Sequence, residues 1–308
     1  MRLDDIGESS NLEDRRGQGG YGDGGGGFGL PVGGGGVGIG MMIILGIIGW
    51  LFGINPAILI GGAEILTGGR GGQVSAPAPR RDPNAPVTRD ADQQFVSRVL
   101  KSTEEVFGEQ LKKQLNVTYR PPRLVMFSGA TRSGCGAAQS AMGPFYCPLD
   151  QTVYLDTAFF AEMKSRMRAG GDFAYAYVIA HEVGHHVENQ LGILPKVQEM
   201  QQRVGRREGN ALSVRVELMA DCLAGVWANH ADQRFNLLEQ GDVEEAMNAA
   251  SQIGDDKLQK QSQGYVVPDS FTHGSSAQRV EWFSRGLKTG DIRACDTFNA
   301  RQQRQSNW

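Results

Sequence analysis

Apolar residues recur every three to four positions through most of the region after residue 89, which is the period of an amphipathic helix. The pattern predicts helices at Asp90–Leu115, Thr157–Met167, Asp172–Leu191, Pro195–Val204, Ala211–Ala231, Val243–Ile253 and Ser275–Leu287. Two short apolar runs, Arg123–Phe127 and Thr152–Leu155, predict strands. A small sheet followed by many helices is typical of the α+β class, so we expect one mostly helical domain over residues 89–308.

The N-terminal part of the chain has a different composition. The whole chain has 43 glycines, and many of them fall before residue 75. Residues 1–36 combine mixed charges with glycine repeats. Such a segment cannot bury enough apolar surface to offset its ordering entropy, so we expect it to be disordered. Residues 61–88 are rich in Gly, Pro and Ala, which predicts a flexible linker.

Residues 37–60 carry no charged side chain over 24 positions, a length that can span a bilayer. The alternatives are a buried helix of a soluble core, for which the run is long, and a cleaved signal peptide. Against the signal peptide, the preceding region carries more acid than base. We therefore predict one transmembrane helix and a lipid bilayer as a partner.

The prediction of how this span is oriented in the membrane depends on the cysteines. Arginines lie on both sides of residues 37–60, so the positive-inside rule does not decide it. Four cysteines without a C-x-x-C pair favour disulfides, and hence an oxidising compartment for the C-terminal domain. The formal net charge of −3 gives no indication of a nucleic-acid partner.

Candidate chemistry lies in the predicted helix Asp172–Leu191, which holds three of the five histidines. His181 and His185 are four residues apart on one face, so both imidazoles can reach one metal ion. Glu182 stands beside them, where its carboxylate can contact a metal-bound water. This H-E-x-x-H arrangement is typical of zinc hydrolases, and the alternative is a chance match on a buried helix. His186 points roughly 100° around the helix, which favours a structural role.

A third ligand is predicted in the next strongly periodic helix, Leu212–Ala228. Glu217 and Asp221 lie four apart on a mostly apolar face, where two carboxylates need partners because unpaired burial is costly. We expect Glu217 to bind the metal and Asp221 to accept the other ring N–H of a ligating histidine. The alternative is an ordinary surface pair that involves Arg215.

Several segments resemble a known family: HEVGHHVENQLG, VELMADCLAGVWA, DSFTHGSSAQRVEWFSRGLKTGD, the opening MRLDDIGESSNLEDRRG and CGAAQSAMGPFYCPLDQTVYLD. They resemble the bacterial predicted neutral zinc metallopeptidases, membrane-anchored proteins of the gluzincin type. The resemblance implies a zincin-like domain with His181, His185 and Glu217 as zinc ligands. With the predicted span, it implies a single-pass protein of the inner (cytoplasmic) membrane with a periplasmic or extracytoplasmic C-terminal domain.

The segment Phe271–Arg279 is similar to the T-H-P-x-x-x-x-R element of related membrane gluzincins, with Gly274 in place of the proline. The similarity implies that His273 hydrogen-bonds the oxyanion of the reaction and that Arg279 holds a carboxylate such as Asp221 or a substrate group. The alternative for His273 is a polar residue at the entry to a helix.

Two disulfides can be drawn among the cysteines. Cys135 and Cys147 flank one loop and can close it, which leaves Cys222 and Cys295 as the second pair. Spacing leaves the other pairings open, and Cys222 can also be a small buried thiol.

The predicted function is therefore peptide-bond hydrolysis by a zinc-bound water, with Glu182 as general base and a peptide or protein as substrate. The strand Val153–Leu155 is the expected edge strand for the substrate backbone. Two alternatives stay open: a catalytically silent, membrane-tethered scaffold that keeps zinc for structure, and a protein-interaction module whose histidine motif is accidental. The pattern contains no signal for a specificity pocket or an oligomeric state.

Overall fold

The computed structural model describes residues 1–17, 90–139 and 143–299. The predicted linker and the predicted transmembrane segment 37–60 lie outside these residues. The N-terminal residues 1–17 are ordered, so the prediction of disorder is wrong for them. Ile6 is buried in the core, and Leu12–Asp14 form a strand, β1.

The main sheet has four strands in the order β1-β2-β6-β5. Its other members are β2 (Arg123–Phe127), β6 (Thr152–Asp156) and β5 (Phe145–Cys147). β1, β2 and β6 run parallel, whereas β5 is antiparallel to β6. A separate hairpin is formed by β3 (Ala130–Ser133) and β4 (Gly136–Gln139).

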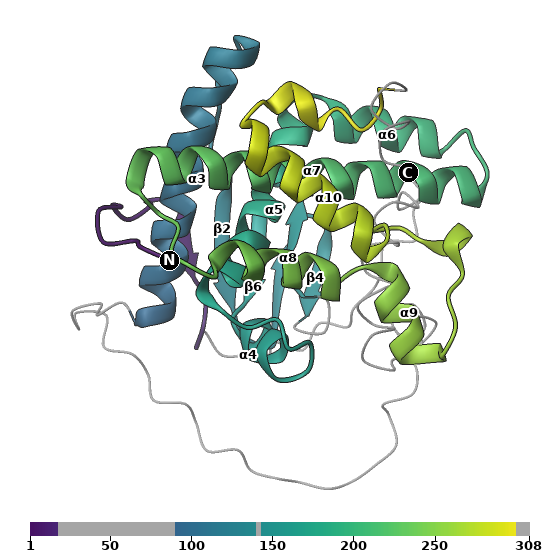
Figure 1. The fold of residues 1–308 in the computed structure, drawn as a ribbon, viewed down its shortest axis with the longest axis horizontal. Helices are drawn as coiled ribbons and strands as arrows, with labels where there is room; N and C mark the ends of the chain where they lie inside the picture. Colours follow the sequence, from purple (N-terminus) through teal and green to yellow (C-terminus); the bar gives the residue numbers. More distant parts are fainter. Residues whose placement is uncertain (18–89, 140–142, 300–308) are drawn as a thin grey trace, which may run out of the picture.

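Helices make up most of the rest of the described chain, which confirms the α+β class (Figure 1). The α-helices are α3 (Ala91–Leu115), α4 (Ala158–Ser165), α5 (Asp172–Gln190), α6 (Ile193–Gln201), α7 (Arg206–Phe235), α8 (Asp242–Gln252), α9 (Asp255–Gln263) and α10 (Ser276–Thr289). Two 3-10 turns, η2 (Pro268–Ser270) and η3 (Ile292–Cys295), flank α10.

Helix α5 is the centre of the fold. It contacts β5 and β6 of the sheet as well as α3, α7 and α8, and every residue from Ala176 to Glu188 is buried. A helix buried on all sides belongs to a core rather than to a surface. Gly184 permits the close approach to α7, because a Cβ at this position would lie 3.1 Å from the Cα of Ala220. The two helices that carry the predicted ligands are therefore directly packed.

The N-terminal segment belongs to the same body as the C-terminal domain. Leu12 pairs with Leu124 in the sheet, and the Met1 ammonium lies 2.8 Å from the carboxylate of Asp172 at the start of α5. A chain that crossed a bilayer once between residues 17 and 90 would place β1 and β2 on opposite sides of the membrane. The predicted localisation as a single-pass inner-membrane protein is therefore wrong.

The helices themselves agree with this correction. Among the described residues, no helix combines the length and the apolar character that a bilayer crossing requires. The longest of them, α7, has 30 residues, but its first turn carries Arg206, Arg207 and Glu208.

The expected substrate strand is also corrected. Val153–Leu155 belong to β6, which lies between β2 and β5 and has paired backbone on both sides. A peptide cannot add to a strand whose two edges are already hydrogen-bonded. The end strand on this side of the sheet is β5.

The disulfide prediction is confirmed. Cys135 is bonded to Cys147 and Cys222 to Cys295, with Cα–Cα distances of 5.8 and 5.4 Å. The first bond ties the β3–β4 hairpin to β5, and the second holds η3 against α7.

Candidate metal centre

Helix α5 presents two imidazoles to the same point. His181 and His185 are buried one turn apart, and their ring centroids are 4.7 Å apart. This is the geometry that the i, i+4 spacing predicted.

Helix α7 brings a carboxylate to these rings. One oxygen of Glu217 lies 3.2 Å from His181 Nε2, and the other lies 3.6 Å from His185 Nε2. One ligand atom from each of the three residues can be chosen so that all lie within 4.8 Å of one another. Tetrahedral zinc with bonds of about 2.0–2.1 Å places ligand atoms about 3.3 Å apart, so the two carboxylate–imidazole distances suit zinc. We call His181, His185 and Glu217 the metal group.

The second ring nitrogen of each histidine, Nδ1, contacts a carboxylate. His181 Nδ1 is 2.9 Å from an oxygen of Asp221, and His185 Nδ1 is 2.8 Å from an oxygen of Glu188. If each Nδ1 donates to its carboxylate, the tautomer leaves Nε2 free to bind a metal. The contact of Asp221 was expected, whereas that of Glu188 was missed. Its position three residues after His185 is the signal that could have found it.

Asp221 lies at the centre of a buried polar network. Arg279, only 2% exposed, donates from Nε to one oxygen of Asp221 at 2.8 Å and from a terminal nitrogen to the other at 2.9 Å. The hydroxyl of Tyr177 also donates to Asp221. Burial by itself would raise the pKa of Asp221, but the Arg279 guanidinium and the bond from His181 hold that pKa below its usual range. The predicted partnership of Arg279 with Asp221 is therefore present.

His273 reaches the metal group from the loop before α10. Its Nε2 lies 3.9 Å from a Glu217 oxygen, while its Nδ1 lies 3.5 Å from the carboxylate of Asp255. Asp255 also accepts the backbone N–H groups of Thr272, His273 and Gly274 at 2.7–3.0 Å. Sequence reasoning missed this role of Asp255.

Gly274 explains why the chain departs from the related T-H-P element. Its φ is +88°, in the left-handed region, whereas proline is fixed near −65°. The loop that carries His273 therefore enters α10 along a path that proline cannot take.

Burial raises the pKa of both glutamates of the site, Glu182 and Glu217, and the nearby histidines lower it. Burial raises the pKa of Glu182, although His185 and His181 oppose the change. Burial would also raise the pKa of Glu217, but His273 and His185 lower it far below its usual value. This lowering favours the ionised carboxylate that a metal ligand must provide.

The remaining histidines have structural contacts. His186 Nδ1 lies 3.0 Å from the Tyr146 hydroxyl on β5, and its Nε2 lies 2.6 Å from the carbonyl oxygen of Arg120. His230 Nε2 lies 2.8 Å from the carbonyl oxygen of Gly290. His186 thus ties α5 to β5, the end strand of the sheet.

Comparison with known proteins identifies a matching family and uncharacterized relatives. The model of the family described as "Putative neutral zinc metallopeptidase" matches residues 1–298. The uncharacterized protein YpfJ of Escherichia coli (strain K12) is 50% identical over 300 residues, which cover 97% of this chain and 99% of the relative. The uncharacterized protein Rv2575 of Mycobacterium tuberculosis is 42% identical over 221 residues, or 68% of this chain and 73% of the relative. No solved structure matches the chain.

Proposed function

This chain belongs to the neutral zinc metallopeptidase family, and on that premise we propose that it hydrolyses peptide bonds in a polypeptide substrate with a zinc ion held by His181, His185 and Glu217. The observation that carries the proposal is the metal group. Two imidazole nitrogens and a carboxylate, from helices that are packed together, converge to within 4.8 Å of one another, with carboxylate–imidazole distances of 3.2 and 3.6 Å.

The zinc ion, when bound, supplies a Lewis acid that activates water and polarises a carbonyl group at neutral pH. Glu182 follows His181 directly on α5 and is 8% exposed. We assign it the role of general base, which takes a proton from the attacking water and delivers it to the leaving amine.

His273 is assigned to the oxyanion. Asp255 holds its Nδ1 side, which leaves Nε2 directed toward the metal group, where it can donate to a developing negative charge. Arg279 is assigned a positioning role: it holds Asp221, and Asp221 in turn orients His181.

The test compares the full-length wild type with Glu182→Gln and Glu217→Ala for zinc content and for cleavage of a peptide library and an unfolded protein. We expect Glu182→Gln to retain one zinc per chain while hydrolysis falls by at least about 100-fold. We expect Glu217→Ala to lose zinc as well as activity.

Two outcomes would contradict the proposal. Full activity of Glu182→Gln would remove Glu182 from the reaction. A wild type that holds zinc but cleaves nothing in the library would instead indicate a zinc-binding scaffold.

A further inference from the structure

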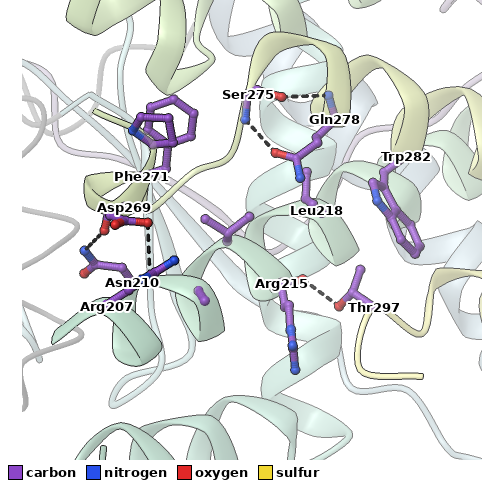
Figure 2. Close-up of a pocket in the computed structure, with 13 residues that line it drawn as sticks. Arg207, Asn210, Arg215, Leu218, Asp269, Phe271, Ser275, Gln278, Trp282 and Thr297 are labelled. Atoms are coloured by element: carbon purple, nitrogen blue, oxygen red, sulfur yellow. Dashed lines mark hydrogen bonds and ion pairs between the residues drawn. The ribbon is translucent and has the colours of Figure 1, made fainter. Parts of the chain in front are cut away.

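A second feature lies beside the metal group. A cavity of about 590 Å³ is formed by the N-terminal half of α7, the start of α10, η2 and the segment around Thr297 (Figure 2). None of the residues of the metal group lines it.

The wall between this cavity and the metal group is thin at two places. On α7, Glu217 faces the histidines and the next residue, Leu218, lines the cavity. On the loop before α10, His273 faces the metal group. A Cβ on the next residue, Gly274, would lie 3.3 Å from side-chain atoms of Leu218 and Val214. On α7 consecutive residues therefore face the two sites, and Gly274, next to His273, packs against two residues that line the cavity.

The lining offers hydrogen-bond donors that have no partner within the described parts of the chain. The Arg215 guanidinium makes no ion pair there and packs over the Phe298 ring at 5.7 Å. The side-chain oxygen of Gln278 accepts the N–H of Ser275 at 2.9 Å, but its nitrogen has no described acceptor. The indole N–H of Trp282 likewise has none among these residues. Unpaired donors favour a ligand that is rich in acceptors.

The charge and the apolar surface of the lining further restrict the chemical class of ligand that the cavity can bind. Asp269 is the one carboxylate among the lining residues, and it is paired with Arg207 at 3.1 Å, which leaves Arg215 as the uncompensated charge. Side chains of Val214, Leu218 and Phe271 supply apolar surface. A carboxylate next to an aliphatic or aromatic side chain matches both properties.

We propose that this cavity binds a segment of the polypeptide substrate in which a glutamate or aspartate is next to a large apolar residue. The inference rests on the proposed function, because it assigns the segment to the same chain that is cleaved at the metal group. Since the two sites share a wall, the cavity selects substrates that carry this acidic segment near the cleaved bond.

The test measures binding separately from cleavage. Two fluorescent, terminally capped peptides of leucine and glutamate, or of leucine and lysine in the same order, are titrated against zinc-loaded, full-length Glu182→Gln by anisotropy. We expect the glutamate peptide to bind at least about tenfold more tightly than the lysine peptide. We expect Arg215→Glu to abolish or reverse this preference.

The control variant is Arg203→Glu. Arg203 lies near the end of α6, is paired with Glu199 and does not line the cavity, so it changes net charge by the same amount at another place. Equal binding of the two peptides by Glu182→Gln, or equal effects of Arg203→Glu and Arg215→Glu, would overturn the proposal. Arg215→Gln, with urea unfolding as a check of folding, replaces Arg215→Glu if the latter does not fold.

Cleavage assays separate this inference from the proposed function. Selective binding of the glutamate peptide without hydrolysis of any substrate by the wild type would support the proposed binding site and refute the proposed peptidase activity. Hydrolysis with no preference for acidic segments would support the proposed peptidase activity and refute the proposed role of the cavity in substrate selection.

Discussion

Asp221→Asn tests the buried network directly. Asp221 is fully buried, and all of its hydrogen-bond partners can donate: the Tyr177 hydroxyl, His181 Nδ1 and two nitrogens of Arg279. An asparagine amide keeps the shape, but in either orientation its NH₂ group faces at least one of these donors. The substitution also leaves the Arg279 guanidinium buried without a counter-charge.

The magnitude follows from that burial. Removal of one partner from a buried ion pair costs about 3–5 kcal/mol, against a total stability of about 5–15 kcal/mol for a typical domain. His181 also loses the charge of its acceptor, so we expect zinc affinity to fall about 10–100-fold.

The assay is urea unfolding followed by circular dichroism, in the Glu182→Gln background to prevent self-cleavage and with a chelator to remove the contribution of metal. Zinc affinity is measured separately by competition with a metal indicator. The matched control is Glu199→Gln, because the Glu199–Arg203 pair is exposed and exposed pairs contribute about 0–1 kcal/mol.

A double variant separates stability from metal affinity. Asp221→Leu with Arg279→Met replaces the ion pair by apolar groups, so we expect it to be more stable than Asp221→Asn while zinc affinity stays low. If Asp221→Asn loses no more stability than Glu199→Gln, the argument from an uncompensated buried charge is refuted.

Three further predictions follow from the same site. Glu188→Met removes the acceptor of His185 Nδ1 and is expected to weaken zinc binding about 10–100-fold, whereas Glu188→Gln, which keeps an acceptor, retains most of the affinity; equal affinities would contradict this. Chelation is expected to lower the thermal unfolding midpoint of the wild type but not that of Glu217→Ala, and equal shifts would exclude Glu217 as a ligand. Burial would raise the pKa of Asp255, but hydrogen bonds from His273 and the backbone hold it below 3.8. Its stabilising effect is therefore present above this pH and is lost as pH falls through the lower folded value. Urea unfolding should show a difference between wild type and Asp255→Asn that shrinks as pH falls from 5 to below 3.8, and a difference that grows over this range would contradict the assignment.

The helices that carry the metal group were predictable because their patterns are local. The predicted helix Asp172–Leu191 differs from α5 by one residue at its end, and the second helix was found within the longer α7. Three of the missed elements have weaker local signals. Helix α9 is polar apart from Leu258, and β1 and β5 have three residues each. Short or polar segments acquire their structure from the partners against which they pack.

The sequence by itself determined the chemistry that periodicity can encode. Two histidines one turn apart and a glutamate on the apolar face of a second helix define a candidate zinc site before any coordinates are known. Only the tertiary structure decided which groups hold those ligands, because Glu188, Asp255 and the cavity beside Arg215 are identified by contacts and not by spacing.

The tertiary structure also decided the topology of the chain. A charge-free run over residues 37–60 predicted a single membrane crossing, yet Leu12 pairs with Leu124 in one sheet. Hydropathy is a property of a local window, whereas a parallel strand pair is a set of hydrogen bonds between segments far apart in the chain. Those bonds require both segments to lie on the same side of any membrane, and no local pattern records that requirement.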